Sequence, residues 1–269
     1  AASLPDAVTV QQEAAAKTVP EEAALQAAAP LDMYKSLGRK VFSATALQTY
    51  LHCQRRYYYQ QLGLPGCEEA GEQSSQLPAY VTGLIVHTAL EKYRGDEEKA
   101  FQAAADKHAG GRVDLASDAK KLLHDYLASD LYKTIPPVHQ REIKFNCAQQ
   151  ELLLTGVIDC LYTAEDGSLM IIDYKTGRPP EAGSVPKGYA YQLALYKAAA
   201  EQLFGRQVRS AQLHFLQNLS VCEPVLGEET LQEALELCRQ ISSKVDEADF
   251  TCSTDKCGGC PYGYLCPRK

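Results

Sequence analysis

The sequence lacks the long apolar segments of a membrane protein, because no run of about 18 consecutive apolar residues occurs in it. Its opening stretch, AASLPDAV, has neither the basic nor the apolar region of a secretory signal peptide. An initiator Met is missing as well, so we expect a piece of a longer polypeptide. No G-x-x-x-x-G-K-[ST] loop is present, which excludes a P-loop nucleotide site from this chain.

Two features of the composition leave the class of protein open. The net charge is −7, but carboxylates that bind a cation count as negative until the cation arrives, so charge excludes no partner. The ten cysteines are an even number and would suit a disulfide framework. The length of 269 residues, the missing leader and the clustering of cysteines at one end instead favour a cytoplasmic protein with a metal-binding segment.

The chain divides by composition into two parts. Residues 1–36 are a mixture of Ala, Glu, Gln and Pro that cannot build a core, so we expect a linker or tail there. Residues 37–269 form the folded part, for which the order of elements predicts an α/β fold: a mixed central sheet flanked by helices, with a helical N-terminal part and a C-terminal cysteine segment. Hydrophobic spacing and turn signals predict helices at 43–63, 79–95 and 97–130, strands at 141–148, 151–163 and 169–177, a helix at 187–205, strands at 208–217 and 220–225, and a helix at 228–248.

Charged side chains interrupt two of the predicted strands. Asp173 and Lys175 are two residues apart in IIDYKTG, so both side chains leave the same face of the sheet. Asp159 lies in the preceding strand, and the turn signal AEDGS predicts a hairpin that brings Asp159 level with Asp173. Two close carboxylates repel each other unless a cation lies between them, and oxygen ligands suit Mg²⁺ or Mn²⁺. The alternative is a structural ion pair between Asp173 and Lys175.

Five motifs in this chain resemble a known enzyme family. In order they are FSATALQTYLHCQRRYYY, GLIVHTALEKY, GVID, IIDYKTG and YAYQLALYKAAA, and together they extend over most of residues 42–269. The ordered set resembles the RecB-like branch of the PD-(D/E)XK nuclease superfamily, whereas a D-x-K motif by itself would be far less specific. The resemblance implies a restriction-endonuclease-like fold.

The same resemblance implies a role for each motif residue. Taken alone, a helical histidine is more often part of a core than a metal ligand, and a Gln–Tyr pair one turn apart is more often plain packing. Glu142 in the first strand is a smaller expectation, since acids there sometimes approach the metal in this family, and a solvated strand residue is an equal alternative. The implied set comprises the metal ligands His87, Asp159, Asp173 and the Tyr174 carbonyl, the catalytic lysine Lys175, and Gln192 and Tyr196 in contact with DNA or supporting the site.

The last segment, TCSTDKCGGCPYGYLCPRK, contains a C-x2-C-x5-C spacing formed by Cys257, Cys260 and Cys266. Zinc and iron–sulfur sites both take four ligands, so a fourth ligand must come from Cys252 or from a distant residue. In the iron–sulfur members of the branch that the motifs resemble, a cysteine of the opening helix supplies it, and Cys53 stands there. The resemblance thus implies a 4Fe-4S cluster on Cys53, Cys257, Cys260 and Cys266, with Cys252 as the rival ligand.

Such a cluster would fasten the end of the folded part to its beginning, and we expect its role to be structural rather than redox. The remaining cysteines are expected to be buried or incidental thiols: Cys67, Cys147, Cys160, Cys222 and Cys238.

As a whole, the resemblance implies a metal-dependent DNA exonuclease that prefers single strands or duplex ends. It would be the nuclease part of a helicase–nuclease of the AddB or RecB type, in DNA repair or recombination, with the helicase motor outside this chain. Three other interpretations stay open: a CRISPR-adaptation nuclease of the same branch, a silent iron–sulfur DNA-binding scaffold, and a zinc-binding interaction module. Residues available for holding DNA are Arg55, Arg56, Tyr57, Tyr58 and Arg178, whose alternative is a solvated helix face with core aromatics.

Overall fold

The computed structural model describes residues 40–66, 77–181, 185–247, 250–253, 257–258 and 260–266. The chain divides into two units, residues 1–37 and 38–269, and the described residues all belong to the second. The linker predicted over residues 1–36 and the predicted thiol of Cys67 lie outside the described residues. None of the described helices is long and apolar enough to cross a membrane.

The folded unit follows the predicted order of helices and strands, with one additional short strand at its start. In chain order the elements are β1 (Val41–Ser43), α2 (Ala44–His52), α3 (Gln54–Gln61), α4 (Ala79–Lys92), α5 (Glu97–His108), a 3-10 turn η1 (Val113–Leu115), α6 (Ser117–Ala128), α7 (Asp130–Lys133), β2 (Gln140–Gln149), β3 (Leu152–Thr163), β4 (Leu169–Lys175), α8 (Lys187–Phe204), β5 (Val208–Phe215), β6 (Ser220–Cys222) and α9 (Glu228–Glu247).

Two predicted helices are each broken into shorter ones. The first begins as predicted, because the Ser43 hydroxyl accepts a 3.1 Å hydrogen bond from the Ala46 amide at the start of α2. The extended backbone of Cys53, with a φ of −160°, then separates α2 from α3. The second is interrupted after α5, where Gly110 and Gly111 have φ values of 58° and 83° that end a right-handed helix. Cys53 therefore stands at a joint between helices rather than inside one.

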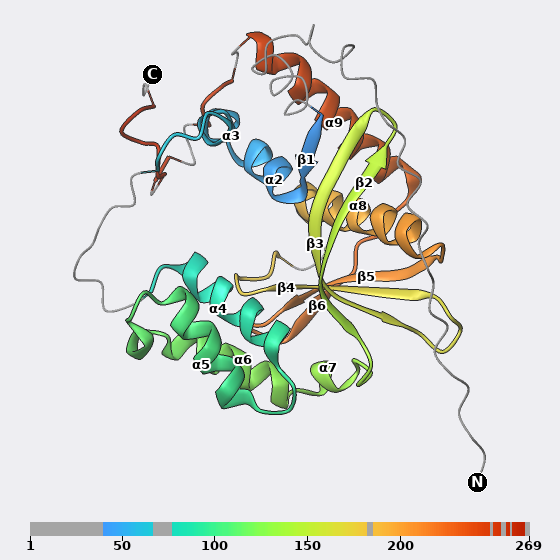
Figure 1. Cartoon of the computed structure of the whole chain (residues 1–269). Coiled ribbons are helices and arrows are strands. Elements are labelled where there is room, and N and C mark those ends of the chain that lie inside the picture. Colours follow the sequence, from blue (N-terminus) through green and yellow to red (C-terminus); the bar gives the residue numbers. More distant parts are fainter. Residues whose placement is uncertain are drawn as a thin grey trace, which may run out of the picture. The chain divides into compact units, whose positions relative to one another are not determined.

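In the described part of the chain, the strands form one mixed sheet of six strands (Figure 1). β2, β3 and β4 form the predicted antiparallel meander, and Gly167, with a φ of 87°, lies in the turn between β3 and β4. β5 pairs in parallel with β4, and β6 pairs antiparallel with β5. β1 pairs in parallel with the first part of β3, an extension that the sequence did not predict. The fold is thus the mixed α/β arrangement that the sequence predicted.

Helices cover both faces of this sheet. α2, α8 and α9 lie on one side and α4 to α7 on the other (Figure 1). Alternation along the strands builds a separate core for each layer: Leu161 and Ile171 belong to the core of α2, α8 and α9, whereas Cys160 and Ile172 belong to the core of α4, α5 and α6. The charged residues of β3 and β4 therefore lie where the two layers approach the same strands.

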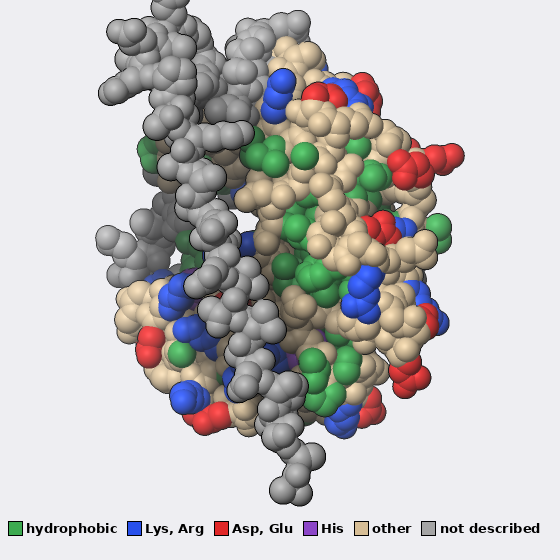
Figure 2. Space-filling model, turned by 45° about the vertical axis from the view of Figure 1, so that its right-hand side comes forward, with side chains coloured by type: hydrophobic (Ala, Val, Ile, Leu, Met, Phe, Trp, Pro, Cys, Tyr) green, Lys and Arg blue, Asp and Glu red, His purple; other side chains and the backbone are tan. Residues whose placement is uncertain are grey.

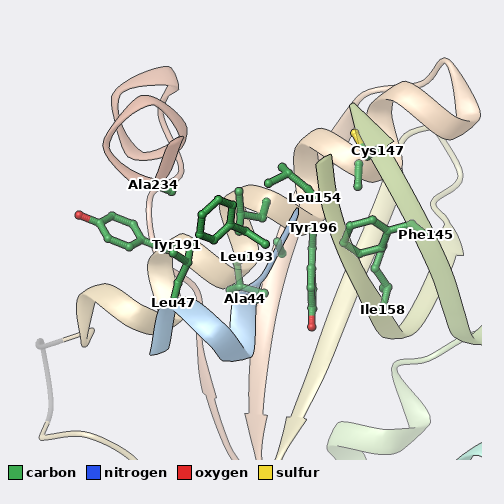
Figure 3. Close-up of a cluster of buried hydrophobic side chains, with 14 of the residues drawn as sticks. Ala44, Leu47, Phe145, Cys147, Leu154, Ile158, Tyr191, Leu193, Tyr196 and Ala234 are labelled. Carbon is green, nitrogen blue, oxygen red and sulfur yellow. The ribbon is translucent and has the colours of Figure 1, made fainter. Parts of the chain in front are cut away.

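Figure 3 shows the first of these cores, with side chains from α2, β2, β3, α8 and α9 in contact. The rings of Phe145 and Tyr196 meet edge to face at a centroid distance of 5.7 Å, across the backbone of Gly156. The hydroxyl of Tyr196 points out of this core in the figure. A side of the core is thus also a wall of the charged region.

Gly156 allows this close approach, because an added Cβ would lie 2.7 Å from Cζ and 2.8 Å from Cε1 of the buried Phe145 ring. Replacing Gly156 with alanine is expected to lower the free energy of unfolding by roughly 1–3 kcal/mol, as overpacked cores do. Denaturant unfolding measures this change. The matched control is Gly227→Ala, whose added Cβ would meet nothing closer than 4.0 Å, and equal stability of the two variants would contradict the account.

A buried histidine in the second core makes stability depend on pH. Burial lowers the pKa of His214 to about 4, and the neutral ring accepts from the Tyr126 hydroxyl at Nδ1 over 2.8 Å. Its pKa is higher in the unfolded chain, so this stabilisation is complete above about pH 6.5 and is lost as pH falls toward 4.

Between pH 7 and pH 5, the wild type is therefore expected to lose on the order of 2 kcal/mol more unfolding free energy than His214→Gln. Urea unfolding at both pH values measures the difference, and His124→Gln, at an exposed position of α6, is the control. Parallel pH profiles for the wild type and His214→Gln would contradict this assignment.

Candidate functional site

A cavity of about 910 Å³ opens where the two helical layers meet the sheet. Side chains of α2, α4, β2, β3, β4 and α8 line it. The residues that the sequence singled out for metal binding and catalysis, which lie far apart in the chain, all line this one cavity: His87, Glu142, Asp159, Asp173, Tyr174, Lys175, Gln192 and Tyr196.

The β3–β4 hairpin sets the two aspartates beside each other. Cys160 pairs with Ile172 at the end of the ladder, and one further step in this register brings Asp159 level with Asp173, as predicted. At that point the Asp159 side chain replaces the backbone as acceptor, since its Oδ2 receives a 2.8 Å hydrogen bond from the Tyr174 amide. Both carboxylates are buried, with exposed fractions of 8% for Asp159 and 2% for Asp173. Such burial is costly unless the charges are paired or bind a cation.

α4 brings a histidine to this pair of aspartates. Nδ1 of His87 lies 3.2 Å from Oδ1 of Asp159. Burial alone would lower the pKa of His87, but the Asp159 carboxylate outweighs burial and raises it to about 9. Gly83, one turn earlier, allows α4 to approach β4, because an added Cβ would lie 3.2 Å from Oγ1 of Thr176. The close approach that the sequence predicted for Gly83 is confirmed.

The second aspartate is held by a network of hydrogen bonds from α8. Oδ2 of Asp173 lies 2.7 Å from Nζ of Lys175, and its Oδ1 accepts a 2.8 Å hydrogen bond from Nε2 of Gln192. Oε1 of Gln192 accepts from Lys175 over 2.9 Å, and its Nε2 also donates to the Tyr196 hydroxyl over 3.0 Å. Burial raises the pKa of Asp173, although Lys175 opposes the shift. The spacing of two residues does place Asp173 and Lys175 on one face, as predicted.

Glu142 joins the same group from β2. Its φ of 50° is a left-handed conformation that a glutamate rarely adopts, and it interrupts the pairing of β2 with β3 opposite Asp159. Burial, followed by repulsion from Asp159, raises the pKa of Glu142 to about 7. A buried, strained carboxylate beside another carboxylate indicates a site that attracts a cation.

The side chains present fit a divalent cation. One ligand atom each from His87, Glu142 and Asp159 lie within 4.8 Å of one another, and Asp173 adds a further buried carboxylate to the cavity. Carboxylate oxygens with one imidazole nitrogen suit Mg²⁺ or Mn²⁺. The Tyr174 ring lies in the core of α4 to α6, and the role of its carbonyl stays a prediction.

A second cavity, between α3 and the C-terminal segment, is lined by cysteines. They are Cys53, Cys252, Cys257, Cys260 and Cys266. Sγ of Cys252 lies 3.3 Å from Sγ of Cys266 and 3.6 Å from Sγ of Cys257, so the predicted rival ligand sits among the predicted set. Burial raises the pKa of Cys53, but hydrogen bonds from the backbones of Ser253, Arg56 and Arg55 outweigh it and lower the pKa. These contacts favour the thiolate, the form that binds metals.

Aromatic packing holds the C-terminal segment against α2 and α3. Phe250 is fully buried and stacks on Tyr58 at a centroid distance of 4.9 Å. The Tyr59 hydroxyl donates to the carbonyl of Leu265 over 3.2 Å. Tyr57 is also buried in this core, which favours the core alternative over a base contact for its ring. The beginning and the end of the folded part are therefore neighbours, as the predicted cluster requires.

The residues predicted to hold DNA are divided between the two cavities. Arg55 and Arg56 line the cysteine cavity and not the carboxylate cavity. Arg178 is exposed and follows Thr176 and Gly177, which line the carboxylate cavity. On the face drawn in Figure 2, Lys and Arg side chains gather in the lower left part, and Asp and Glu side chains lie mainly toward the right. Contact with DNA stays a prediction for all three arginines.

The other described cysteines are free thiols away from this cavity. Cys147, Cys160 and Cys238 are buried, in agreement with the prediction, and Cys222 is half-buried.

Sequence reasoning missed one residue of the carboxylate cavity. Nε2 of Gln48, in α2, donates to Oε1 of Gln192 over 2.8 Å and to the Gly188 carbonyl over 3.3 Å. Because Oε1 then accepts from both Gln48 and Lys175, the amide of Gln192 is oriented with its NH₂ group toward Asp173. The only sequence signal was the position of Gln48 within the opening motif, since its partners are more than a hundred residues away.

Comparison with known proteins identifies the class of fold. A family model described as "PD-(D/E)XK nuclease superfamily" matches residues 41–267. A crystal structure of a proposed exonuclease from Eubacterium rectale superposes with a TM-score of 0.52 at 12% identity, covering 81% of this chain and 86% of the other. At this identity the likeness concerns the fold.

Relatives of known name match shorter parts of the chain. An ATP-dependent helicase/nuclease protein of Clostridium kluyveri is 31% identical over 87 residues, which are 32% of this chain and 6% of the relative. The protein of the same name from Moorella thermoacetica is 41% identical over 70 residues, 26% of this chain and 5% of the relative. The chain thus spans only a small part of the length of these curated relatives.

Proposed function

The chain belongs to the PD-(D/E)XK nuclease superfamily, and from this premise we propose that it is a metal-dependent deoxyribonuclease acting in the carboxylate cavity. The observation that carries the proposal is the meeting of Asp159, Asp173 and Lys175 with His87 in one buried site. The buried charges, the strained Glu142 and the raised pKa values all indicate a place built for a cation.

The side chains divide the work of phosphodiester hydrolysis. His87, Asp159, Asp173 and the Tyr174 carbonyl would hold the cation, with Glu142 as a further carboxylate. When bound, a divalent ion supplies an acidified water and Lewis-acid stabilisation of the phosphate. The Lys175 ammonium, fixed between Asp173 and Gln192, would orient the attacking water and stabilise negative charge on the phosphate.

Residues outside the ligand set would keep this arrangement in place. Gln192 connects Lys175 to Asp173, and Gln48 and Tyr196 fix the orientation of its amide. At neutral pH without a cation, His87 would carry a proton and donate it to Asp159, because its pKa is raised to about 9. Cation binding would have to displace this proton, so cation affinity should rise with pH.

We further propose that cleavage is exonucleolytic and coupled to a helicase. The motif resemblance supports an exonuclease of the RecB-like branch, and the names of the relatives support a helicase–nuclease. These names do not point to the AddB or RecB type that the motifs resemble, so the proposal is kept at the level of a helicase–nuclease. The motor would lie outside this chain, which has no P-loop.

The cysteine cavity is proposed to hold a 4Fe-4S cluster on Cys53, Cys257, Cys260 and Cys266. Sulfurs bound to one zinc ion by bonds of about 2.3 Å lie within roughly 4.6 Å of one another. Among the described residues no three cysteine sulfurs are within 4.8 Å of one another, a wider spacing that favours a polynuclear cluster over a single zinc ion. The cluster would staple α3 to the C-terminal segment and add folding energy.

Digestion of labelled single-stranded DNA tests the proposed function. With Mn²⁺ or Mg²⁺, linear DNA should be shortened to small products, and chelation of the metal with EDTA should stop the reaction. Circular single-stranded DNA of the same sequence should resist, because it offers no end. Equal cutting of circles would overturn the exonuclease assignment, and absence of products with both metals would overturn the nuclease assignment.

A further inference from the structure

Two arginines of α3 are placed beside the cysteines without a hydrogen-bond acceptor for part of their charge. Arg55 and Arg56 follow Cys53 within the first turn of α3, and both line the cysteine cavity. The Nε atoms of both side chains are buried, and neither has a hydrogen-bond partner among the described residues. A side-chain hydrogen bond with Tyr59 holds Arg55 in this position. Two buried N–H donors therefore require an acceptor that the side chains alone do not supply.

The chemistry of the cavity limits what that acceptor can be. Apart from the two arginines, its lining consists of cysteines, tyrosines and a glycine, and no carboxylate is among the described lining residues. A buried N–H of a charged group is costly without a partner, whereas sulfur of a metal-bound thiolate is anionic and accepts hydrogen bonds. A cluster held by four thiolates would bring such acceptors and a net negative charge into the cavity.

We propose that Arg55 and Arg56 are positioning residues of the iron–sulfur cluster, each donating its Nε–H to sulfur of the cluster or its cysteine ligands. The inference rests on the cluster of the proposed function and not on the nuclease site. It assigns these two residues to the cysteine cavity in place of the DNA contacts predicted for them. Two guanidinium charges here also explain how an anionic group can be accommodated beside the buried aromatic residues of this segment.

Two measurable properties follow from this arrangement. Hydrogen bonds and positive charge near a cluster stabilise its more negative, reduced state, so they raise its reduction potential. They also slow the loss of iron, because the thiolate ligands are held in place. A role limited to packing would move neither the potential nor its dependence on charge.

The test uses the full chain, purified without oxygen, and four variants: Arg55→Gln, Arg56→Gln, Arg55→Lys and Arg56→Lys. Each glutamine variant is expected to release iron to a chelator about tenfold faster than the wild type and to show a lower reduction potential. Each lysine variant keeps the charge but loses Nε–H, so its potential should lie closer to that of the wild type while release stays faster. Arg112→Gln, at an exposed position far along the chain, is the control.

Binding of single-stranded DNA is measured on the same proteins, with Ca²⁺ to prevent cleavage. Unchanged iron release and potential together with weakened DNA binding would overturn the proposal and favour DNA contact. Lysine variants that retain iron as well as the wild type would overturn the role of Nε–H. Wild-type protein without iron would overturn both the cluster and this inference, while the digestion of labelled DNA would still decide the nuclease function separately.

Discussion

Replacing Lys175 with alanine is expected to slow DNA cleavage by about a thousandfold, with little change in the affinity for DNA. The Lys175 ammonium lies 2.7 Å from Asp173 and 2.9 Å from Gln192, so its position is fixed before substrate arrives. Such a fixed charge lowers the barrier mainly by stabilising the transition state, and its loss therefore reduces kcat more than it raises KM. Initial rates on labelled single-stranded DNA with Mn²⁺ measure the effect.

The control for this variant is Lys120→Ala, on the exposed face of α6, which removes the same charge outside the cavity. It should cleave at the wild-type rate. Circular dichroism and thermal unfolding establish that Lys175→Ala is folded, since removing Lys175 leaves the buried Asp173 without its ion pair. Folded Lys175→Ala with undiminished kcat would contradict the proposed mechanism.

Loss of the cysteine at the joint between α2 and α3 is expected to remove the cluster. Cys53→Ala should contain far less iron than the roughly four irons per chain of the wild type and should lose its absorption near about 400 nm. The cluster closes a loop from Cys53 to the C-terminal segment, so by chain entropy its loss should cost about 4 kcal/mol of stability. Iron analysis and thermal unfolding measure both changes.

Cys238→Ala is the matched control for this prediction. Cys238 is buried like Cys53 but lies in α9, in the core and away from the cysteine cavity. Cys238→Ala should keep its iron. Because Cys252 contacts two of the predicted ligands, Cys252→Ala distinguishes the rival assignments: we expect its iron content to be unchanged. Iron lost from Cys252→Ala and retained in Cys53→Ala would contradict the ligand set.

The sequence predicted those parts of the fold and site that depend on local spacing. The two-residue step from Asp173 to Lys175 sets both on one face, and the short turn at 164–168 determines the register that brings Asp159 level with Asp173. Gly83 marked the close approach of α4 to β4 for the same reason: a missing Cβ is visible in the sequence. Periods and turns are short-range properties, so their consequences can be read from neighbouring residues.

Other features depend on contacts between distant segments, and the sequence did not predict them. The orientation of Gln192 is set by Gln48 of α2, and β1 forms only because β3 offers it an edge. The break at Cys53 interrupts a continuous helical pattern, since the C-terminal segment packs against the joint. Likewise Arg55 and Arg56 follow the helical spacing of a solvated face, yet α3 turns them toward the cysteines.

Anomalous diffraction from crystals soaked with Mn²⁺ tests the central claim most directly, because manganese scatters anomalously and iron can be separated from it by wavelength. The account predicts one manganese peak in the carboxylate cavity, with His87, Asp159 and Asp173 as neighbours, and its disappearance in Asp159→Asn. Failure of manganese to bind there in the wild type, or binding that persists unchanged in Asp159→Asn, would contradict it.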